Sequence, residues 1–214
     1  MSNRSIHTLL KNWDEECPLT REEAVEVLNL PEEEMDSLME CAYALRTKYK
    51  GKKVSVQLLT NVRSGNCTQN CAYCAQSKDS QAEIEKYKRV SDEKLYGDND
   101  LVDEKHLARH CIGLSGIGFS DEEIEDLADR IREMKKKDTQ ICCSIGFLTE
   151  KQARILKDAG LDRINHNLNS SRSFYPEICT THTYDQRVNN IKMLQSLGFE
   201  ICSGGIVGMG ESKE

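Results

Sequence analysis

Three cysteines lie close together in the first half of the chain, with types and spacing suited to metal chemistry. They are Cys67, Cys71 and Cys74, and they form a C-x3-C-x2-C pattern. Three thiolates in one short loop can hold three irons of a cube-shaped 4Fe-4S cluster and leave the fourth iron open. A structural zinc site normally takes four protein ligands, and this segment contains no fourth Cys or His. The pattern therefore favours an iron–sulfur cluster over zinc.

The open iron gives such a cluster a chemical use. It can chelate the amino and carboxylate groups of S-adenosylmethionine (SAM), and an electron from the cluster then breaks a carbon–sulfur bond to give a 5′-deoxyadenosyl radical. In this chemistry the cofactors carry the difficult step, and the protein binds, orients and shields them. The sequence therefore predicts cofactor-binding residues around the loop.

The composition limits the classes of protein to consider. The chain has 214 residues, ten cysteines and a formal net charge of −7. Such a negative field repels a phosphate backbone, so nucleic acid is not an expected partner. No long apolar run and no apolar signal-peptide core occur, which predicts a cytoplasmic protein without a membrane span. In a reducing compartment, clustered cysteines indicate metal binding rather than disulfides.

Segments typical of strands and helices alternate after Gly51. Apolar, β-rich segments occur at residues 54–59, 111–114, 140–145, 163–168 and 200–207, and helical patterns occur at 121–136, 149–159 and 184–197. This alternation predicts βαβ units and a parallel sheet. An eight-stranded barrel takes about 250 residues. We therefore predict an α/β fold, a partial TIM-type barrel of about five of the eight strands over residues 51–214, preceded by an N-terminal helical extension at residues 1–50.

Two features depart from a regular complete barrel. The segment YGDND at residues 96–100 places Gly, Asp and Asn before the second strand, which disfavours a continuous helix there. Strands six to eight find no counterpart in the 214 residues. A curled five-stranded parallel sheet leaves its edges and interior exposed, so we expect this chain alone to associate or to dissolve poorly.

Strand periodicity brings further cysteines onto a common face. Residues i and i+2 of a strand share a face, so Cys111 lies with Arg109, and Cys142 points away from its neighbour Cys143. Cys202 stands on a third strand. A barrel interior is normally filled by branched apolar side chains. Three cysteines on three strands therefore predict a second metal site inside the barrel.

The fourth strand carries amides in the same periodic way. Asn165, Asn167 and Asn169 share one face, and His166 lies on the other, where we expect a packed core histidine. A buried amide without a partner costs about 1–3 kcal/mol. Three inward amides therefore predict a polar ligand in the barrel.

At these residues the chain resembles the radical SAM superfamily and, within it, the biotin synthase family. The resemblance is densest at residues 63–76, at 163–187 (RINHNLNSSRSFYPEICTTHTYDQR) and at 201–211 (ICSGGIVGMGE). It implies a SAM-dependent sulfurtransferase that inserts sulfur into dethiobiotin in biotin biosynthesis. It also implies a homodimer that receives electrons from a donor such as flavodoxin or ferredoxin.

The resemblance also assigns roles to individual residues. An auxiliary 2Fe-2S cluster, the family's sulfur donor, would be held by Cys111, Cys142 and Cys202, with Arg109 nearby. In most family members an arginine on one of strands six to eight completes this cluster, so the 214 residues alone are expected to make no biotin. The SAM site would be formed by Tyr73 and Ile206 at the adenine, Asn167 at SAM and dethiobiotin, Asn169 at the ribose, and Arg187 at the carboxylate.

Other interpretations stay open at this point. The chain is also compatible with another radical SAM enzyme, of the mutase or maturase type, which would need the SAM site but not all three barrel cysteines. It is also compatible with an inactive truncated fragment that binds iron–sulfur or zinc. Cys179 and His110 are candidates for additional ligands, and no physical role is assigned to His182. The remaining cysteines, Cys17, Cys41 and Cys143, are predicted to be structural.

Overall fold

The computed structural model describes residues 19–213, which fall into two compact units divided after Val54, with the last few residues grouped with the first unit. The first unit contains α2 (Arg21–Leu28), the short 3-10 helix η1 (Glu32–Glu34) and α3 (Met35–Lys50). Thr20 caps α2 in a reciprocal pair with Glu23, the capping box that commonly starts a helix. Within residues 19–213, no helix has the length and apolar character needed to cross a membrane.

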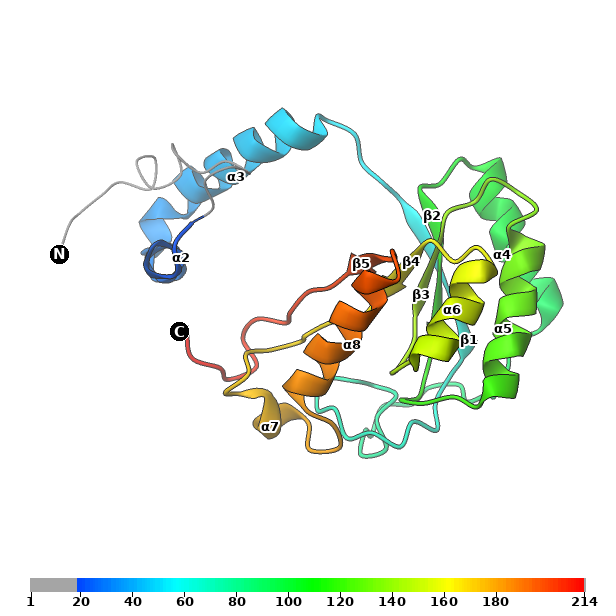
Figure 1. Cartoon of the computed structure of the whole chain (residues 1–214). Coiled ribbons are helices and arrows are strands. Elements are labelled where there is room, and N and C mark those ends of the chain that lie inside the picture. The colour runs from blue at the N-terminus through cyan, green and yellow to red at the C-terminus, as the bar shows by residue number, and fades with distance from the viewer. Residues whose placement is uncertain (1–18, 214) are drawn as a thin grey trace. The chain divides into compact units, whose positions relative to one another are not determined.

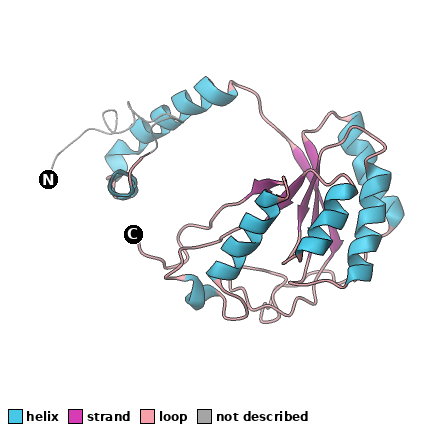
Figure 2. Ribbon diagram, viewed as in Figure 1, coloured by secondary structure: helices cyan, strands magenta, loops and turns pink. Residues whose placement is uncertain are grey.

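The second unit is built on a five-stranded parallel sheet whose strands follow one another in chain order (Figures 1 and 2). Helices connect consecutive strands, so each step is a βαβ unit. This confirms the predicted α/β fold, a partial TIM-like barrel. The strands are β1 (Gln57–Arg63), β2 (Arg109–Leu114), β3 (Ile141–Ser144), β4 (Arg163–Asn165) and β5 (Glu200–Cys202); the helices are α4 (Asp92–Glu104), α5 (Asp121–Met134), α6 (Glu150–Asp158), α7 (Tyr175–Ile178) and α8 (Tyr184–Ser196).

The apolar core lies between the sheet and the helices. Ile112, Cys143 and Ile164 occupy neighbouring strands and are fully buried against side chains from α4, α5, α6 and α8. Cys143 is thus a structural residue of this core, as predicted. Because successive side chains of a strand alternate between faces, the opposite face of the same strands carries the cysteines and amides that the sequence singles out.

The expectation that YGDND interrupts a helix is wrong, because α4 runs straight through it. Two polar side chains of this segment, Asp98 and Asn99, have partners on the sheet. Asp98 accepts hydrogen bonds from Lys94 Nζ at 2.6 Å and from Thr60 Oγ1 at 2.6 Å, and Asn99 Oδ1 lies 3.2 Å from His110 Nδ1. His110 therefore points toward α4 and away from the barrel interior, which removes it as a candidate for an additional ligand.

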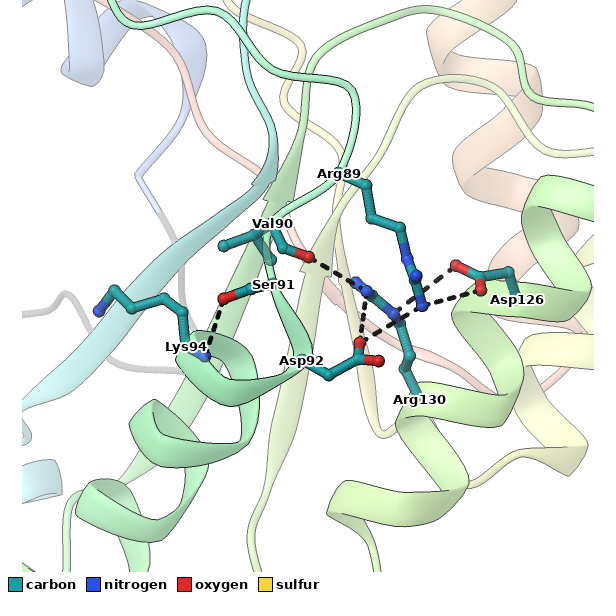
Figure 3. A network of polar contacts seen from close by, with 7 residues as sticks. All are labelled: Arg89, Val90, Ser91, Asp92, Lys94, Asp126 and Arg130. Carbon is teal, nitrogen blue, oxygen red and sulfur yellow. Dashed lines mark hydrogen bonds and ion pairs between the residues drawn. The ribbon is translucent and has the colours of Figure 1, made fainter.

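A second polar network joins the start of α4 to α5 (Figure 3). The side chain of Arg130 is only 3% exposed, and its Nη2 donates to Asp92 Oδ1 at 2.5 Å and to the carbonyl of Val90 at 3.1 Å. Arg89 contributes ion pairs to Asp92 at 3.3 Å and to Asp126 at 3.1 Å. The buried guanidinium is therefore paired with carboxylates that remain in contact with solvent.

The strands differ from the predicted segments mainly at their ends. β1 begins three residues later than predicted and extends to Arg63, because its pairing with β2 continues past Asn61 to the cluster loop. β4 and β5 are shorter than predicted. Beyond them the chain leaves the sheet, and contact continues through an isolated bridge between Asn169 and Gly205.

Candidate metal and cofactor site

The cysteine loop begins at the carboxyl end of β1 and is braced across its base. Gly65 has φ of +70°, a conformation that favours glycine, and a Cβ there would lie 2.5 Å from Lys86 Cγ. Its N–H donates to Gln76 Oε1 at 2.7 Å. Farther along, the carbonyl of Gln69 accepts from the N–H of Lys78 at 2.9 Å. These bonds hold the two ends of the loop together.

The three loop thiols line one cavity of about 290 Å³ at this end of the sheet. Cys71 is buried, whereas Cys67 and Cys74 are partly exposed. Thiolates that share one tetrahedral zinc ion lie about 3.8 Å apart. Among the described residues, these three do not form a group within 4.8 Å of one another. The three thiols are therefore not gathered as closely as three ligands of a single metal ion would be.

A segment after α7 clamps the loop from its other side. Ala72 N–H donates to the carbonyl of Ile178 at 2.9 Å. Asn70 Nδ2 donates to Thr180 Oγ1 at 2.7 Å, and Asn70 Oδ1 accepts from the Thr180 N–H at 3.1 Å. The TTHTY segment therefore supports the loop directly, a role that strand and helix patterns do not reveal.

His182 orients an arginine at the cavity. Arg187 Nη2 lies 2.9 Å from His182 Nε2, and His182 Nδ1 lies 3.0 Å from Gln69 Oε1. Burial, with a contribution from the nearby Arg187 charge, lowers the pKa of His182 to about 4. The ring is therefore neutral, with Nε2 accepting from Arg187 and the Nδ1 proton donated to Gln69. This gives His182 the physical role that the sequence does not.

Two further bonds fix the guanidinium of Arg187. Its Nε donates to Tyr175 Oη at 2.6 Å, and its Nη1 donates to the carbonyl of Asn167 at 3.1 Å. Arg187 lines the cavity together with the loop cysteines. A planar, positively charged fork at this position suits a carboxylate.

The amides of β4 and the segment after it border the same cavity. Asn165, Asn167 and Asn169 all line it, and two of their buried atoms, Asn165 Oδ1 and Asn169 Nδ2, have no hydrogen-bond partner in the described residues. The backbone of Asn169 is held at φ of +69°, and its carbonyl accepts from the Ile206 N–H at 2.7 Å. Unpartnered buried polar atoms are costly, so these positions fit a polar ligand.

Tyr73 and Ile206 occupy different parts of this region. Tyr73 lines the cavity beside the cysteines, and burial raises the pKa of its phenol. Ile206 is 42% exposed and lines an adjoining hollow that also touches Asn169. His166 is buried and packs edge-on to Phe147, with ring centroids 5.3 Å apart. It also borders the cavity, and neither of its ring nitrogens has a hydrogen-bond partner in the described residues.

The second set of cysteines, Cys111, Cys142 and Cys202, lies on the same face of the sheet, farther from the cysteine loop. Strand register places Cys111 beside Cys142, and Cys142 beside Arg163. The adjacent row, which lies closer to the cysteine loop, contains Gly113, Ser144, Asn165 and Cys202. Of these four residues, Gly113, Ser144 and Asn165 line the cavity. Cys202 therefore lies one row closer to the cavity than the other two cysteines.

Two arginines beside this row affect the pKa of one of its thiols. A hydrogen bond from Cys142, with the charges of Arg109 and Arg163, lowers the pKa of the Cys111 thiol to about 7. Arg163 also pairs with Glu200 through Nε at 2.8 Å. Sequence reasoning missed Arg163, because only strand register reveals that it shares a row with two cysteines.

Comparisons with known proteins agree with this geometry. A family model described as the radical SAM superfamily matches residues 61–214. Biotin synthase from Geobacillus kaustophilus (strain HTA426) is 40% identical over 91% of this chain, and that from Bacillus subtilis (strain 168) is 41% identical over 92%. The match covers 59% of each relative, so the chain spans less than two thirds of their length.

Solved structures show the same fold at low sequence identity. A crystal structure of methylornithine synthase has a TM-score of 0.82 and 16% identity, covering 96% of this chain and 59% of that one. A maturase of the FeFe-hydrogenase has a TM-score of 0.79 and 18% identity, covering 96% of this chain and 47% of that one. At such identities the likeness establishes architecture alone.

Proposed function

Because this chain belongs to the radical SAM superfamily, we propose that it binds a 4Fe-4S cluster through Cys67, Cys71 and Cys74 and binds SAM beside it. The observation that carries this proposal is a single cavity. It is lined by the three loop cysteines, which form no disulfide, by the oriented Arg187, and by buried amides without hydrogen-bond partners. When bound, the reduced cluster supplies the electron that cleaves SAM to a 5′-deoxyadenosyl radical. The protein's part is to bind, orient and shield these groups.

The residues of this chain divide that work. Arg187, fixed by His182 and Tyr175, holds the SAM carboxylate. Asn167 and Asn169 bind the polar groups of SAM, and Asn167 also contacts the substrate, while Tyr73 and Ile206 border the adenine. A preorganised site of this kind places the reacting groups without reorganisation at the moment of reaction. None of these residues acts as an acid or a base.

The substrate proposal rests on similarity to the biotin synthases. At 40–41% identity over nine tenths of this chain, these relatives support sulfur insertion into dethiobiotin as the activity of the protein to which this sequence belongs. The row of Cys111 and Cys142, together with Cys202 from the adjacent row, offers a place for an auxiliary 2Fe-2S cluster, with Arg109 nearby. A flavodoxin or ferredoxin would deliver the electrons, and the protein would act as a homodimer.

Metal content tests this proposal against a radical SAM activity of the mutase or maturase type, which would need the SAM site but not all three barrel cysteines. After anaerobic reconstitution we expect about six irons per chain, four for the cube and two for the auxiliary site. The Cys111→Ala/Cys142→Ala/Cys202→Ala protein should lose about two of them. The matched control is Cys143→Ala, which removes a cysteine from the apolar core on the opposite face and should lose none. Unchanged iron in the triple variant would contradict the auxiliary site.

A further inference from the structure

A fourth thiol touches the cluster loop from outside it. The Sγ of Cys179 lies 3.8 Å from the Sγ of Cys71, and both residues are buried. In the described part of the chain, no such contact with a thiol outside the loop is found for Cys67 or Cys74. Among the cysteines that the structure describes, only Cys179 therefore offers a loop cysteine, Cys71, a neighbouring sulfur from outside the loop.

The position of Cys179 is fixed by the same bonds that clamp the loop. Cys179 directly follows α7, and its N–H donates to the carbonyl of Tyr175 at 3.0 Å. Ile178, the residue before it, accepts a hydrogen bond on its carbonyl from the Ala72 N–H at 2.9 Å. Thr180, the residue after it, makes two hydrogen bonds with Asn70. Loop and thiol are thus held together on both sides of the sulfur contact, so the contact does not depend on one mobile side chain.

Cys71, Cys179 and His182 offer three donor atoms within 4.8 Å of one another, but the histidine is not free to bind a metal. Its Nε2 faces the guanidinium of Arg187 at 2.9 Å, and its Nδ1 faces Gln69 Oε1 at 3.0 Å and also lies 3.3 Å from Cys179 Sγ. Both ring nitrogens are thus used in hydrogen bonds, and a cation beside Nε2 would also meet the positive charge of Arg187. The pair of thiols, rather than the trio, is the unit that can bind iron.

We propose that Cys179 is a reserve iron ligand that can take over the iron held by Cys71. This rests on the proposed 4Fe-4S site. Two thiolates on one tetrahedral metal lie about 3.8 Å apart, which is the separation observed. In the exchange, the iron–sulfur bond to Cys71 breaks as the bond to Cys179 forms, and the proton released by Cys179 is taken up by Cys71. No electron is gained or lost.

Reconstitution of four variants tests this proposal by iron and sulfide content and by visible absorption. Cys74→Ala and the double variant Cys71→Ala/Cys179→Ala should each lose about four irons per chain, because two thiolates cannot hold the cube. Cys71→Ala should lose less than one, since Cys179 replaces the missing ligand. Cys179→Ala should keep its full iron. Equal losses in Cys71→Ala and Cys74→Ala would overturn the proposal.

The outcomes separate this inference from the function on which it rests. If the unmutated chain binds no cube, the proposed function fails; if it binds one and Cys71→Ala loses it, only the reserve ligand fails. A second measurement needs no variant. Treating cluster-free protein with the thiol oxidant diamide should link Cys71 to Cys179, seen as a loss of two hydrogens and a cross-linked peptide pair. A link from Cys71 to Cys67 or Cys74 instead would contradict the contact.

Discussion

Burial of His166 should make this protein sensitive to mild acid. His166 is 2% exposed, and burial, followed by the charge of Arg187, lowers the pKa of its ring to about 4, against about 6.5 in an unfolded chain. The folded state therefore binds the proton less well than the unfolded state does. The stability is complete above pH 6.5 and is lost as the pH falls from 6.5 to 4.

The size of the effect follows from the two pKa values. A difference of about 2.5 units corresponds to about 3.4 kcal/mol at full protonation, and the same relation gives about 2 kcal/mol at pH 5. His110 and His182 have pKa values lowered to about 4 as well, so the unmutated chain should lose more than this. A variant that removes only His166 isolates its share.

Urea unfolding of cluster-free protein at pH 7.5 and pH 5.0 measures that share. In His166→Leu, the drop in unfolding free energy between the two pH values should be smaller by about 2 kcal/mol than in the unmutated chain. Ile124→Ala removes a fully buried apolar side chain of α5 and no titratable group, so it should lower stability alike at both pH values. An identical pH dependence in His166→Leu and the unmutated chain would refute the reasoning.

Three further changes test other parts of the structure. Arg130→Ala should lower the unfolding free energy by about 2–3 kcal/mol in urea melts, less than a fully buried pair because Asp92 stays half exposed. Gly146→Ala should lower it by about 2 kcal/mol or more in thermal melts, because a Cβ there would lie 2.3 Å from the carbonyl oxygen of Ile117. Arg187→Lys in reconstituted protein should weaken SAM binding at least tenfold in equilibrium dialysis, since a lysine cannot replace the planar fork.

Properties set by the local chain were accessible from the sequence. The alternation of faces along a strand predicts that Cys142 points into the barrel and Cys143 into the core, and the structure has them so. The start of α5 is local in the same sense, because Ser120 and Glu123 form a capping box three residues apart in the sequence. The spacing within the cysteine loop likewise needs no tertiary information.

Properties set by distant partners were not accessible. Asp98 and Asn99 disfavour a helix by themselves, but Thr60 and His110 on the sheet satisfy them, so tertiary contacts override local preference. The role of His182 depends on Gln69, which lies more than a hundred residues earlier in the chain. The row that joins Cys111, Cys142 and Arg163 depends on strand register, which the sequence does not specify.

The central claim is that the three loop cysteines hold a 4Fe-4S cluster that binds SAM. Electron paramagnetic resonance of the anaerobically reconstituted and dithionite-reduced chain tests it most directly. We expect a signal from a reduced cube that changes shape when SAM is added, and that is absent from Cys74→Ala. Tightly bound zinc in place of iron, or a 4Fe-4S signal that persists unchanged in Cys74→Ala and does not respond to SAM, would contradict the account.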